Sequence, residues 1–518
     1  MTNHTSGAHK LIATLLGGGI DTCFANPGTS EMHFIAALDD FPAMKSYLCL
    51  FEGVATGAAD GFARMRGKPA VTLLHLGPGL ANGLANLHNA KKAGSPVVNV
   101  IGDHATFHKQ YDAPLNSDVE ATAAPYSHHV HSSASVDDIS TDTADAITAA
   151  ISFGGQIAAL ILPADVAWNT SDADIVTPLP PSRSRVDPNT IEQIAQMLGT
   201  ARKTGLILGG EACYGPGLIM AGQIAKASGA TLLAPYATAR RQRGKGIPPI
   251  TRIPFPVDAA VELLAPFDQL ILLGTTEPVA FFAYPGLPSR IIPGHATLST
   301  LTKPTEDIAD ALHRLCTRLG AGAVAPETSR DNLPAEPHGP LMVDSFADVV
   351  ARAIRPNTIL VDEGITSSRA VFGRTAASPA HDTLVNVGGS IGAGLPLALG
   401  AAVACPDRPV LCLSGDGSAG YTLQALWTMA QNRLDITVVI CANHTYEILR
   451  GEMIRVGVMS DNKRANSLLD IVSPRINWVD LAHGFGVPGT RVETAEQLAV
   501  EIERGFDAPG PHLIEAQL

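Results

Sequence analysis

The stretch Pro409-Val-Leu-Cys-Leu-Ser-Gly-Asp-Gly-Ser-Ala-Gly420 decides the fold class of this sequence. It opens as a continuous apolar run, which is typical of a strand buried in a parallel sheet. That run ends in Gly415-Asp-Gly-Ser418, and a helical pattern follows over 422–431. A second apolar run, 436–441, ends at Asn443-His-Thr445. Because ligands of open α/β sheets bind at the carboxyl ends of parallel strands, we expect these two turns to line one site.

The same alternation of short apolar runs and helical patterns covers the rest of the chain. Such alternation predicts parallel sheets with helices on both faces. The predicted strands are 22–25, 47–50, 70–74, 96–101, 205–208, 231–234, 269–273, 358–361, 409–414, 436–441 and 512–517. In the first third they alternate with predicted helices at 30–39, 53–66 and 79–93. The predicted fold class is therefore α/β, with three consecutive parallel-sheet α/β domains.

Two segments rich in proline and polar residues, 178–188 and 323–340, have the composition of domain boundaries. A chain of 518 residues, at roughly 100–200 residues per domain, also favours three domains. We therefore predict domains over 1–177, 189–322 and 341–518.

The amino-acid composition and the net charge exclude several classes of protein. The chain is 46% hydrophobic and 16% charged, which is enough apolar material for a packed core and excludes general disorder. Lys and Arg number 36 against 49 Asp and Glu, a net charge of −13. Because phosphate binding needs a basic surface, we expect no nucleic-acid partner and no anionic membrane partner.

Cysteine usage and the first residues indicate a cytoplasmic protein. The seven cysteines include no C-x-x-C pair, and several lie in apolar runs, as reduced buried thiols do. The N-terminus has the pattern of an amphipathic helix rather than a signal peptide. The uncharged segment 383–406 carries Asn386, Pro396 and five glycines, so we expect a glycine-rich loop and a buried helix there, not a membrane span.

Two interpretations of the glycine turn compete. Gly415-x-Gly417-x-x-Gly420 matches the dinucleotide fingerprint, which would make the protein a nicotinamide-dependent dehydrogenase. That fold needs an acid after the next strand to hold the ribose, and Asn443 stands there instead. Asp416 would also repel a diphosphate unless a cation lay between them. Carboxylate and carboxamide oxygens suit Mg²⁺, which also takes phosphate oxygens, so a metal–diphosphate site explains both anomalies.

Gly415-Asp-Gly-Ser418, with Asn443 27 positions after Asp416, resembles the signature of a large enzyme superfamily. This is the thiamine-diphosphate (ThDP)-dependent 2-oxo-acid decarboxylase and acetolactate synthase superfamily. The chain is most similar to acetolactate synthase large-subunit-like members and is also similar to benzoylformate decarboxylase. Further matching stretches are Asn26–Glu31, Cys49–Arg64, His75–Gly79 and Val387–Gly392. The resemblance covers the first and last thirds, which it implies to be the pyrimidine-binding and diphosphate-binding domains; the central domain matches only in position and length.

The resemblance implies a set of cofactor contacts. Mg²⁺ would be held by the side chains of Asp416 and Asn443 and by the backbone carbonyl of Thr445. Gly415 and Gly417 would let the backbone approach the diphosphate, with hydroxyl donors at Ser418 and Thr366.

The aminopyrimidine of the cofactor would have its own contacts. Glu52 would bind the pyrimidine N1′ and promote loss of the thiazolium C2 proton. The carbonyl of Gly389 would accept from the 4′-amino group, and Ile391 would wedge between the two rings. An ordinary core role remains the alternative for Ile391.

The same resemblance implies substrate contacts. His75 would polarise the substrate or shuttle protons, with a purely structural histidine as the alternative, and Thr29 stands where benzoylformate decarboxylase uses a serine to bind the substrate carboxylate. One departure is clear: the segment 277–286 lacks the second histidine of that enzyme and offers Phe281 and Phe282 instead.

The expected protein is thus a ThDP- and Mg²⁺-dependent lyase or carboligase that acts on a small 2-oxo acid. A non-ligating 2-oxo-acid decarboxylase, the dehydrogenase and a cofactor-binding scaffold without turnover remain alternatives. The family arrangement implies a homodimer or homotetramer with active sites between subunits. We expect no FAD.

Overall fold

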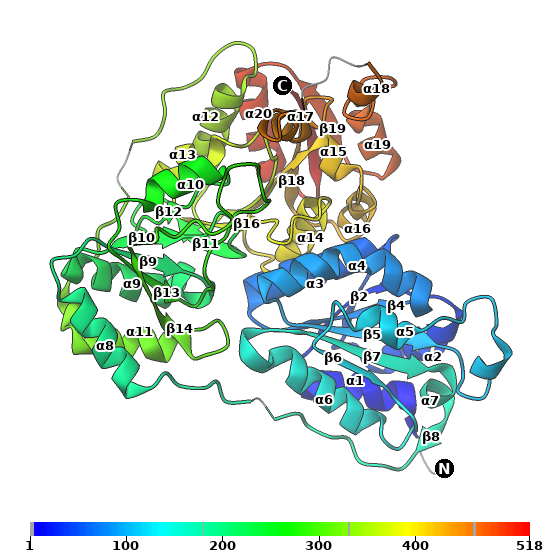
Figure 1. The fold of residues 1–518 in the computed structure, drawn as a ribbon. Helices are drawn as coiled ribbons and strands as arrows, with labels where there is room; N and C mark the ends of the chain where they lie inside the picture. The colour runs from blue at the N-terminus through cyan, green and yellow to red at the C-terminus, as the bar shows by residue number, and fades with distance from the viewer. Residues whose placement is uncertain (1–4, 180, 330–331, 459–462) are drawn as a thin grey trace.

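Residues 5–179, 181–329, 332–458 and 463–518 are described by the computed structural model of the chain (Figure 1). Three sheets dominate it, and each belongs mainly to one third of the sequence. They confirm the predicted α/β class and the succession of parallel-sheet units.

The first sheet is parallel throughout, with strand order β3-β2-β4-β5-β7-β6. Helices α3 and α4 cover one face, and α1 and α6 cover the other (Figure 1). The strands are β2 (Thr22–Asn26), β3 (Lys45–Leu48), β4 (Ala70–Leu74), β5 (Val97–Asp103), β6 (His129–Ser132) and β7 (Ile157–Pro163). The helices are α1 (Gly7–Gly17), α2 (Met32–Ala37), α3 (Glu52–Arg66), α4 (Leu76–Ala93), α5 (Val119–Ala123), α6 (Ile139–Ile151) and α7 (Ala164–Trp168). A two-stranded ribbon, β1 (Thr5–Ser6) with β8 (Thr170–Ser171), closes this unit.

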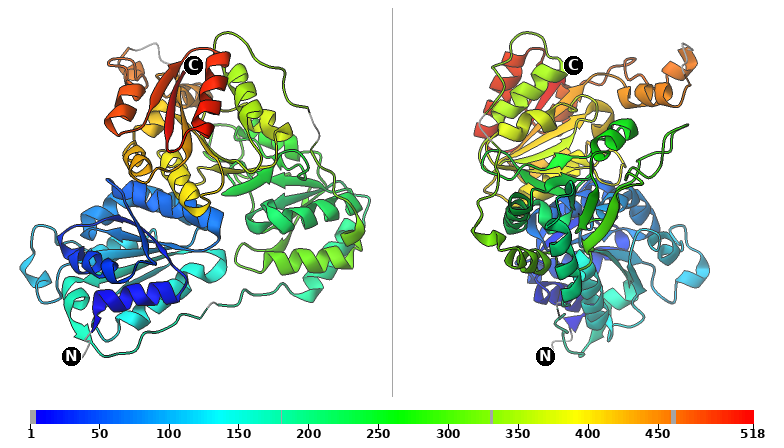
Figure 2. Two further views of the ribbon diagram at one scale, coloured as in Figure 1. Left: turned by 180° about the vertical axis from the view of Figure 1, so that it is seen from behind. Right: turned by 60° about the vertical axis from the view of Figure 1, so that its left-hand side comes forward.

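The central sheet is also parallel, in the order β12-β10-β9-β13-β14. Its strands are β9 (Thr204–Leu208), β10 (Thr231–Ala234), β12 (Thr251–Arg252), β13 (Gln269–Leu273) and β14 (Thr297–Thr302). Its helices are α8 (Pro188–Leu198), α9 (Gly215–Ser228), α10 (Val257–Leu264) and α11 (Ile308–Arg318). Figure 2 shows this unit beside the last one, with an extended segment along the molecule's edge leading to it from the first.

The last sheet has the order β11-β16-β15-β17-β18-β20-β19. Its strands from the last third are β15 (Ile359–Glu363), β16 (His381–Val385), β17 (Val410–Gly415), β18 (Ile436–Ala442), β19 (Gly489–Val492) and β20 (His512–Gln517). Its helices are α12 (Val343–Ala353), α13 (Val371–Arg374), α14 (Gly394–Ala404), α15 (Asp416–Ala419), α16 (Ala425–Gln431), α17 (Glu447–Arg455), α18 (Lys463–Asn466), α19 (Trp478–Gly484) and α20 (Ala495–Asp507).

One strand crosses between units. β11 (Arg240–Arg243) comes from the central third of the chain, yet it pairs antiparallel with β16 at the edge of the last sheet. The local sequence did not predict this strand, because its partner is about 140 residues away along the chain. The domain limits 189–322 and 341–518 stay a prediction, and this strand ties the two units together.

The uncharged segment 383–406 folds as the end of β16, a glycine-rich loop and the buried helix α14. None of the helices in the described ranges is both long and apolar enough to span a membrane.

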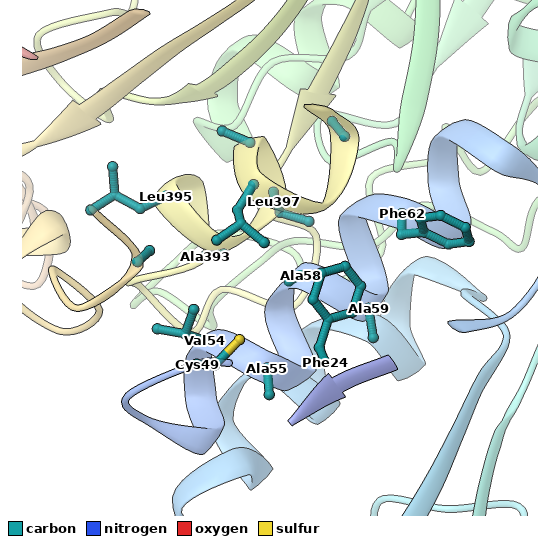
Figure 3. Packing of buried hydrophobic residues seen from close by; sticks show 14 of the residues in the cluster. Phe24, Cys49, Val54, Ala55, Ala58, Ala59, Phe62, Ala393, Leu395 and Leu397 are labelled. Carbon is teal, nitrogen blue, oxygen red and sulfur yellow. The ribbon is translucent and has the colours of Figure 1, made fainter. Parts of the chain in front are cut away.

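Helices α3 and α14 hold the first and last units together. They belong to a single apolar cluster that also takes in Phe24 of the first sheet and Val361 of the last, as Figure 3 shows for part of it. Glycines permit their close approach: a Cβ on Gly400 would lie 1.9 Å from the Ala58 carbonyl oxygen, and one on Gly61 would lie 2.3 Å from that of Leu397.

Gly400→Ala should destabilise the protein by about 1–3 kcal/mol, since its methyl group must push two helix backbones apart. Gly451→Ala is the matched control, because its Cβ would meet nothing within 4 Å on α17. Urea unfolding should show a lower midpoint for Gly400→Ala alone; equal midpoints for the two variants would contradict this account of the helix contact.

Candidate active site

Asp416 lies where β17 ends and α15 begins, beside the end of β18. Its side chain is buried, with Oδ1 accepting from the Gly417 backbone N–H at 2.8 Å and Oδ2 from that of His444 at 2.8 Å. Burial raises the pKa of the Asp416 carboxyl, whereas the two backbone donors act to lower it. The His444 ring also lies near, with Nδ1 3.7 Å from Asp416 Oδ2. A desolvated carboxylate at the mouth of a turn is suited to a cation.

The turn after β18 supplies the other predicted metal ligands. Asn443 Oδ1 accepts from the Thr445 backbone N–H at 3.2 Å, and the Thr445 hydroxyl donates to the Leu469 carbonyl at 3.1 Å. His444 between them has a φ of +56°, a left-handed conformation that is uncommon outside glycine. The two strand ends therefore bring Asp416, Asn443 and Thr445 to the same edge of the sheet, as the sequence predicted.

A cavity of about 390 Å³ opens at this edge. It is lined by Asp416, Gly417, Gly420, Tyr421, Tyr446, Ile471 and Ile476. A Cβ on Gly417 would lie 2.4 Å from the Tyr446 ring, so that ring would have to move to admit any other residue. A Cβ on Gly415 would meet nothing closer than 3.7 Å, which leaves the backbone of that residue open to a ligand. Ser418 is buried on α15, and Thr366 lies half-buried after the neighbouring strand β15.

The loop from Asn386 to Gly394 carries Gly389 and Ile391. Gly389 and Gly392 have φ values of +82° and +90°, which glycine adopts without strain. The buried Glu363 anchors the loop, accepting from the N–H groups of Ala393 at 3.1 Å and Gly394 at 2.8 Å. Burial raises the pKa of Glu363, opposed by these donors.

Helix α4 fixes the same loop from the first unit. The Asn89 side chain donates to the Ser390 carbonyl at 2.8 Å and accepts from the Ser390 N–H at 3.2 Å. His88 Nε2 lies 3.0 Å from the Gly388 carbonyl oxygen. The loop is therefore held in one conformation from two sides.

Glu52 begins α3 and is buried, with 7% of its surface exposed. Its Oε2 accepts from the Asn82 side chain at 2.9 Å. A Cβ on Gly79 would lie 3.0 Å from its Oε1, so the space around the carboxylate depends on that glycine. Asn82 was not predicted as a site residue, although Asn82, Asn86 and Asn89 recur on one face of the helix, a pattern the sequence contains.

His75 forms a dyad with Glu31 that sequence reasoning missed. His75 Nδ1 lies 2.8 Å from Glu31 Oε2, which also accepts from the Gly28 N–H at 2.6 Å. Glu31 is fully buried, and its Oε1 has no hydrogen-bond partner among the described residues. Burial raises the pKa of Glu31, while the Gly28 N–H and His75 oppose that shift.

Two glycines make room for this dyad. A Cβ on Gly28 would lie 2.2 Å from His75 Nδ1, and one on Gly102 would lie 1.6 Å from Glu31 Oε1. The spacing Gly28-x-x-Glu31 is that of a helix-capping box. This spacing is the sequence feature from which the position of the Glu31 carboxylate could have been predicted. Thr29 lies exposed in the same turn.

Within one chain, the predicted residues form two groups. The cavity beside Asp416 is lined only by residues 416–476, and none of Glu52, His75 or Thr29 is part of its wall. Leu48 and Leu50, which precede Glu52, are 38% and 44% exposed.

Comparison with known proteins adds independent findings. Residues 5–123 match the model of the thiamine pyrophosphate enzyme N-terminal TPP binding domain, and residues 364–516 match that of the C-terminal TPP binding domain. A Mycobacterium tuberculosis protein named for the acetolactate synthase large subunit, IlvX, is 48% identical over 98% of each chain. The chain belongs to the thiamine pyrophosphate enzyme family.

Thiamine pyrophosphate is ThDP, so the predicted cofactor and enzyme class are confirmed. Another relative of the family is benzoylformate decarboxylase from Pseudomonas aeruginosa, which is 30% identical over 96% of each chain. A Rhodococcus jostii ThDP-dependent 4-hydroxybenzoylformate decarboxylase shares the fold, with a TM-score of 0.86, 24% identity and coverage of 99% of this chain and 98% of that one. None of these findings supports the dehydrogenase alternative, and Asn443 stands where that fold needs a ribose-binding acid.

Asp416→Asn should weaken Mg²⁺-dependent ThDP binding by at least about 100-fold, since it removes the anionic ligand and loss of an outer contact alone costs roughly 10-fold to 100-fold. Calorimetric titration of ThDP with and without Mg²⁺ measures this. Asp407→Asn, an exposed acid in the turn before β17, is the control and should bind normally. Unchanged Mg²⁺ dependence in Asp416→Asn would remove Asp416 from the metal site.

Proposed function

We propose that the protein is a ThDP- and Mg²⁺-dependent carboligase or lyase that decarboxylates a 2-oxo acid and joins the product to a second carbonyl compound. One observation carries this proposal: a buried Asp416, a fixed Asn443 turn and an open cavity meet at one sheet edge. In this arrangement Asp416, Asn443 and the Thr445 carbonyl would hold Mg²⁺. Ser418, Thr366 and the open backbone of Gly415 would hold the diphosphate.

Bound ThDP supplies a thiazolium that stabilises a carbanion. The protein's task is to move protons and to orient the rings. Glu52, desolvated and oriented by Asn82, would hold a proton at the pyrimidine N1′, and the carbonyl of Gly389 would orient the 4′-amino group. Ile391 lies half-buried in the loop that Glu363 and Asn89 fix, a position suited to a bulky wedge.

His75 would donate or accept a proton at the substrate. Because Glu31 binds Nδ1, the dyad leaves Nε2 as the nitrogen available for proton transfer. Thr29, one residue after Gly28, would bind the substrate carboxylate through its hydroxyl.

Ligation is favoured by the 48% identity to a protein named for acetolactate synthase. The second candidate, a non-ligating decarboxylase of benzoylformate decarboxylase type, is favoured by the aromatic cluster of Phe255, Phe281 and Phe282. The ring centres of Phe255 and Phe281 lie 5.3 Å apart, and those of Phe281 and Phe282 lie 4.9 Å apart. Phe281 also covers Gly389, because a Cβ on that glycine would lie 2.8 Å from the Phe281 ring. Such a wall suits an aromatic 2-oxo acid.

We further propose a cytoplasmic homodimer, or a homotetramer built from it, with Glu52 of one subunit completing the Asp416 site of another. Two observations support this arrangement. The cavity beside Asp416 is lined by residues of the last unit alone, and the apolar Leu48 and Leu50 just before Glu52 are exposed.

Apo-protein with ThDP and Mg²⁺ should release CO₂ from pyruvate, 2-oxobutyrate or benzoylformate, and NMR should identify a C–C coupled product. Glu52→Gln should lower turnover by about 10²–10⁴-fold because proton transfer is lost. Glu120→Gln, an exposed acid on α5, is the control. Free aldehyde as the sole product would establish the decarboxylase instead; full activity of Glu52→Gln would contradict the role of Glu52.

Glu31→Gln should lower kcat by roughly 10-fold to 100-fold, as loss of a proton-transfer partner does. Because burial raises the pKa of Glu31, the dyad loses its negative charge as the pH falls through that raised value, and wild-type activity should fall with it. The acid limb of the pH–rate profile should therefore change shape in Glu31→Gln. An unaltered profile would show that Glu31 has only a structural role.

A further inference from the structure

An unusual concentration of positive charge lies where β11 meets the last sheet. The guanidinium groups of Arg241, Arg243 and Arg252 lie 4.9, 3.6 and 4.2 Å from the centre of the Phe372 ring. Three like charges around one ring repel one another strongly in a desolvated place. Burial and the neighbouring arginines lower the pKa of Arg241 to about 10 and also lower the pKa of Arg243.

One carboxylate, Asp362, acts on this cluster. It is held by the Gly364 N–H at 3.1 Å, and burial raises its pKa. Three arginines against one aspartate leave a charge of 3 − 1 = +2. The other acid nearby, Asp382, is already paired with Arg240 and Arg408.

The same face of the β11–β16 pair collects unsatisfied polar atoms. Arg241 pairs with Thr383 and Arg243 with His381, so these four side chains point to one side of the sheet. Five polar atoms of these side chains are buried and have no hydrogen-bond partner among the described residues: Arg241 Nε and Nη1, Arg243 Nη1, Thr383 Oγ1 and His381 Nε2. Arg241 is only 1% exposed. Buried polar groups are almost always paired, so this grouping indicates a missing partner.

We propose that the face of β11 and β16 around Arg241, Arg243 and Arg252 binds a small dianionic oxyanion, with hydrogen phosphate as the matching ligand. A dianion balances the charge of +2, and its oxygens accept from several guanidinium N–H groups at once. Arg252 is half-buried, which provides an approach from solvent.

This site is separate from the proposed ThDP site. None of the three arginines lines the cavity beside Asp416. It is also separate from a second cavity of about 440 Å³ between the first and central units, whose wall includes Arg183 and Arg240 but none of the three. Arg240 alternates with Arg241 along β11 and therefore faces the other way.

The bound anion would strengthen the seam between the central and last units. β11 is the strand that joins them, and the buried charges of Arg241 and Arg243 on it would otherwise repel one another. Phosphate should therefore stabilise the protein whether or not it turns over substrate, which makes the proposal independent of the proposed function.

Inorganic phosphate should be titrated calorimetrically into full-length protein already saturated with ThDP and Mg²⁺, so that the diphosphate site is filled. We expect one site whose Kd rises at least 10-fold in Arg243→Met and in Arg252→Gln, and is unchanged in Arg183→Met. The half-buried Arg252 keeps the test valid if Arg243→Met fails to fold. At a phosphate concentration of about 100 Kd, Tm should rise by about 2–3 °C.

Sodium chloride at equal ionic strength and AMP serve as comparison ligands. Chloride should give no such heat, and AMP should bind weakly because the site is enclosed. If AMP binds as tightly as inorganic phosphate, the natural ligand of this site would be the phosphoryl group of a larger phosphate ester. No phosphate heat, a chloride effect of equal size, or binding that survives in both cluster variants would overturn the proposal.

Discussion

The contact between α3 and α14 is the constraint on which the active-site arrangement depends. α3 begins at Glu52, and α14 begins where the loop bearing Gly389 and Ile391 ends. Because glycines let the two backbones touch, the helices leave little freedom in the distance between these elements of one chain. In the proposed dimer the two elements would contribute to different sites, so the contact would fix how those sites are placed relative to each other. Asn86 reinforces the contact by donating to the Gly53 carbonyl at 2.8 Å and lying 3.5 Å from that of Gly392.

Buried carboxylates recur at the ends of the elements that build the site. Asp416, Glu363 and Glu31 each accept from backbone N–H groups at a turn, and burial raises the pKa of each. Glu363 uses this arrangement to hold a loop, Glu31 to orient a histidine, and Asp416 to present an anion to a cavity. The same local device therefore serves anchoring, positioning and the proposed metal binding.

Local features were predictable from the sequence, and long-range ones were not. The alternation of strands and helices predicted the three sheets, and the order of the apolar runs predicted that Asp416 and Asn443 follow neighbouring strands. β3 was predicted at 47–50 and spans Lys45–Leu48, because the apolar run extends beyond the paired residues. β11, the Glu31–His75 dyad and the hold of Asn89 on Ser390 join residues far apart in sequence, so no local pattern specifies them. The roles assigned to individual site residues stay predictions.

The most direct test of the account is complementation between two inactive variants, Glu52→Gln and Asp416→Asn, carried on differently tagged chains and purified together as a mixed dimer. If Glu52 completes the Asp416 site of the other subunit, the mixed dimer holds one intact site of two and should regain about half of wild-type activity. If both residues act within one chain, every site in the mixed dimer is damaged. Absence of recovery in a correctly assembled mixed dimer would therefore contradict the shared active site.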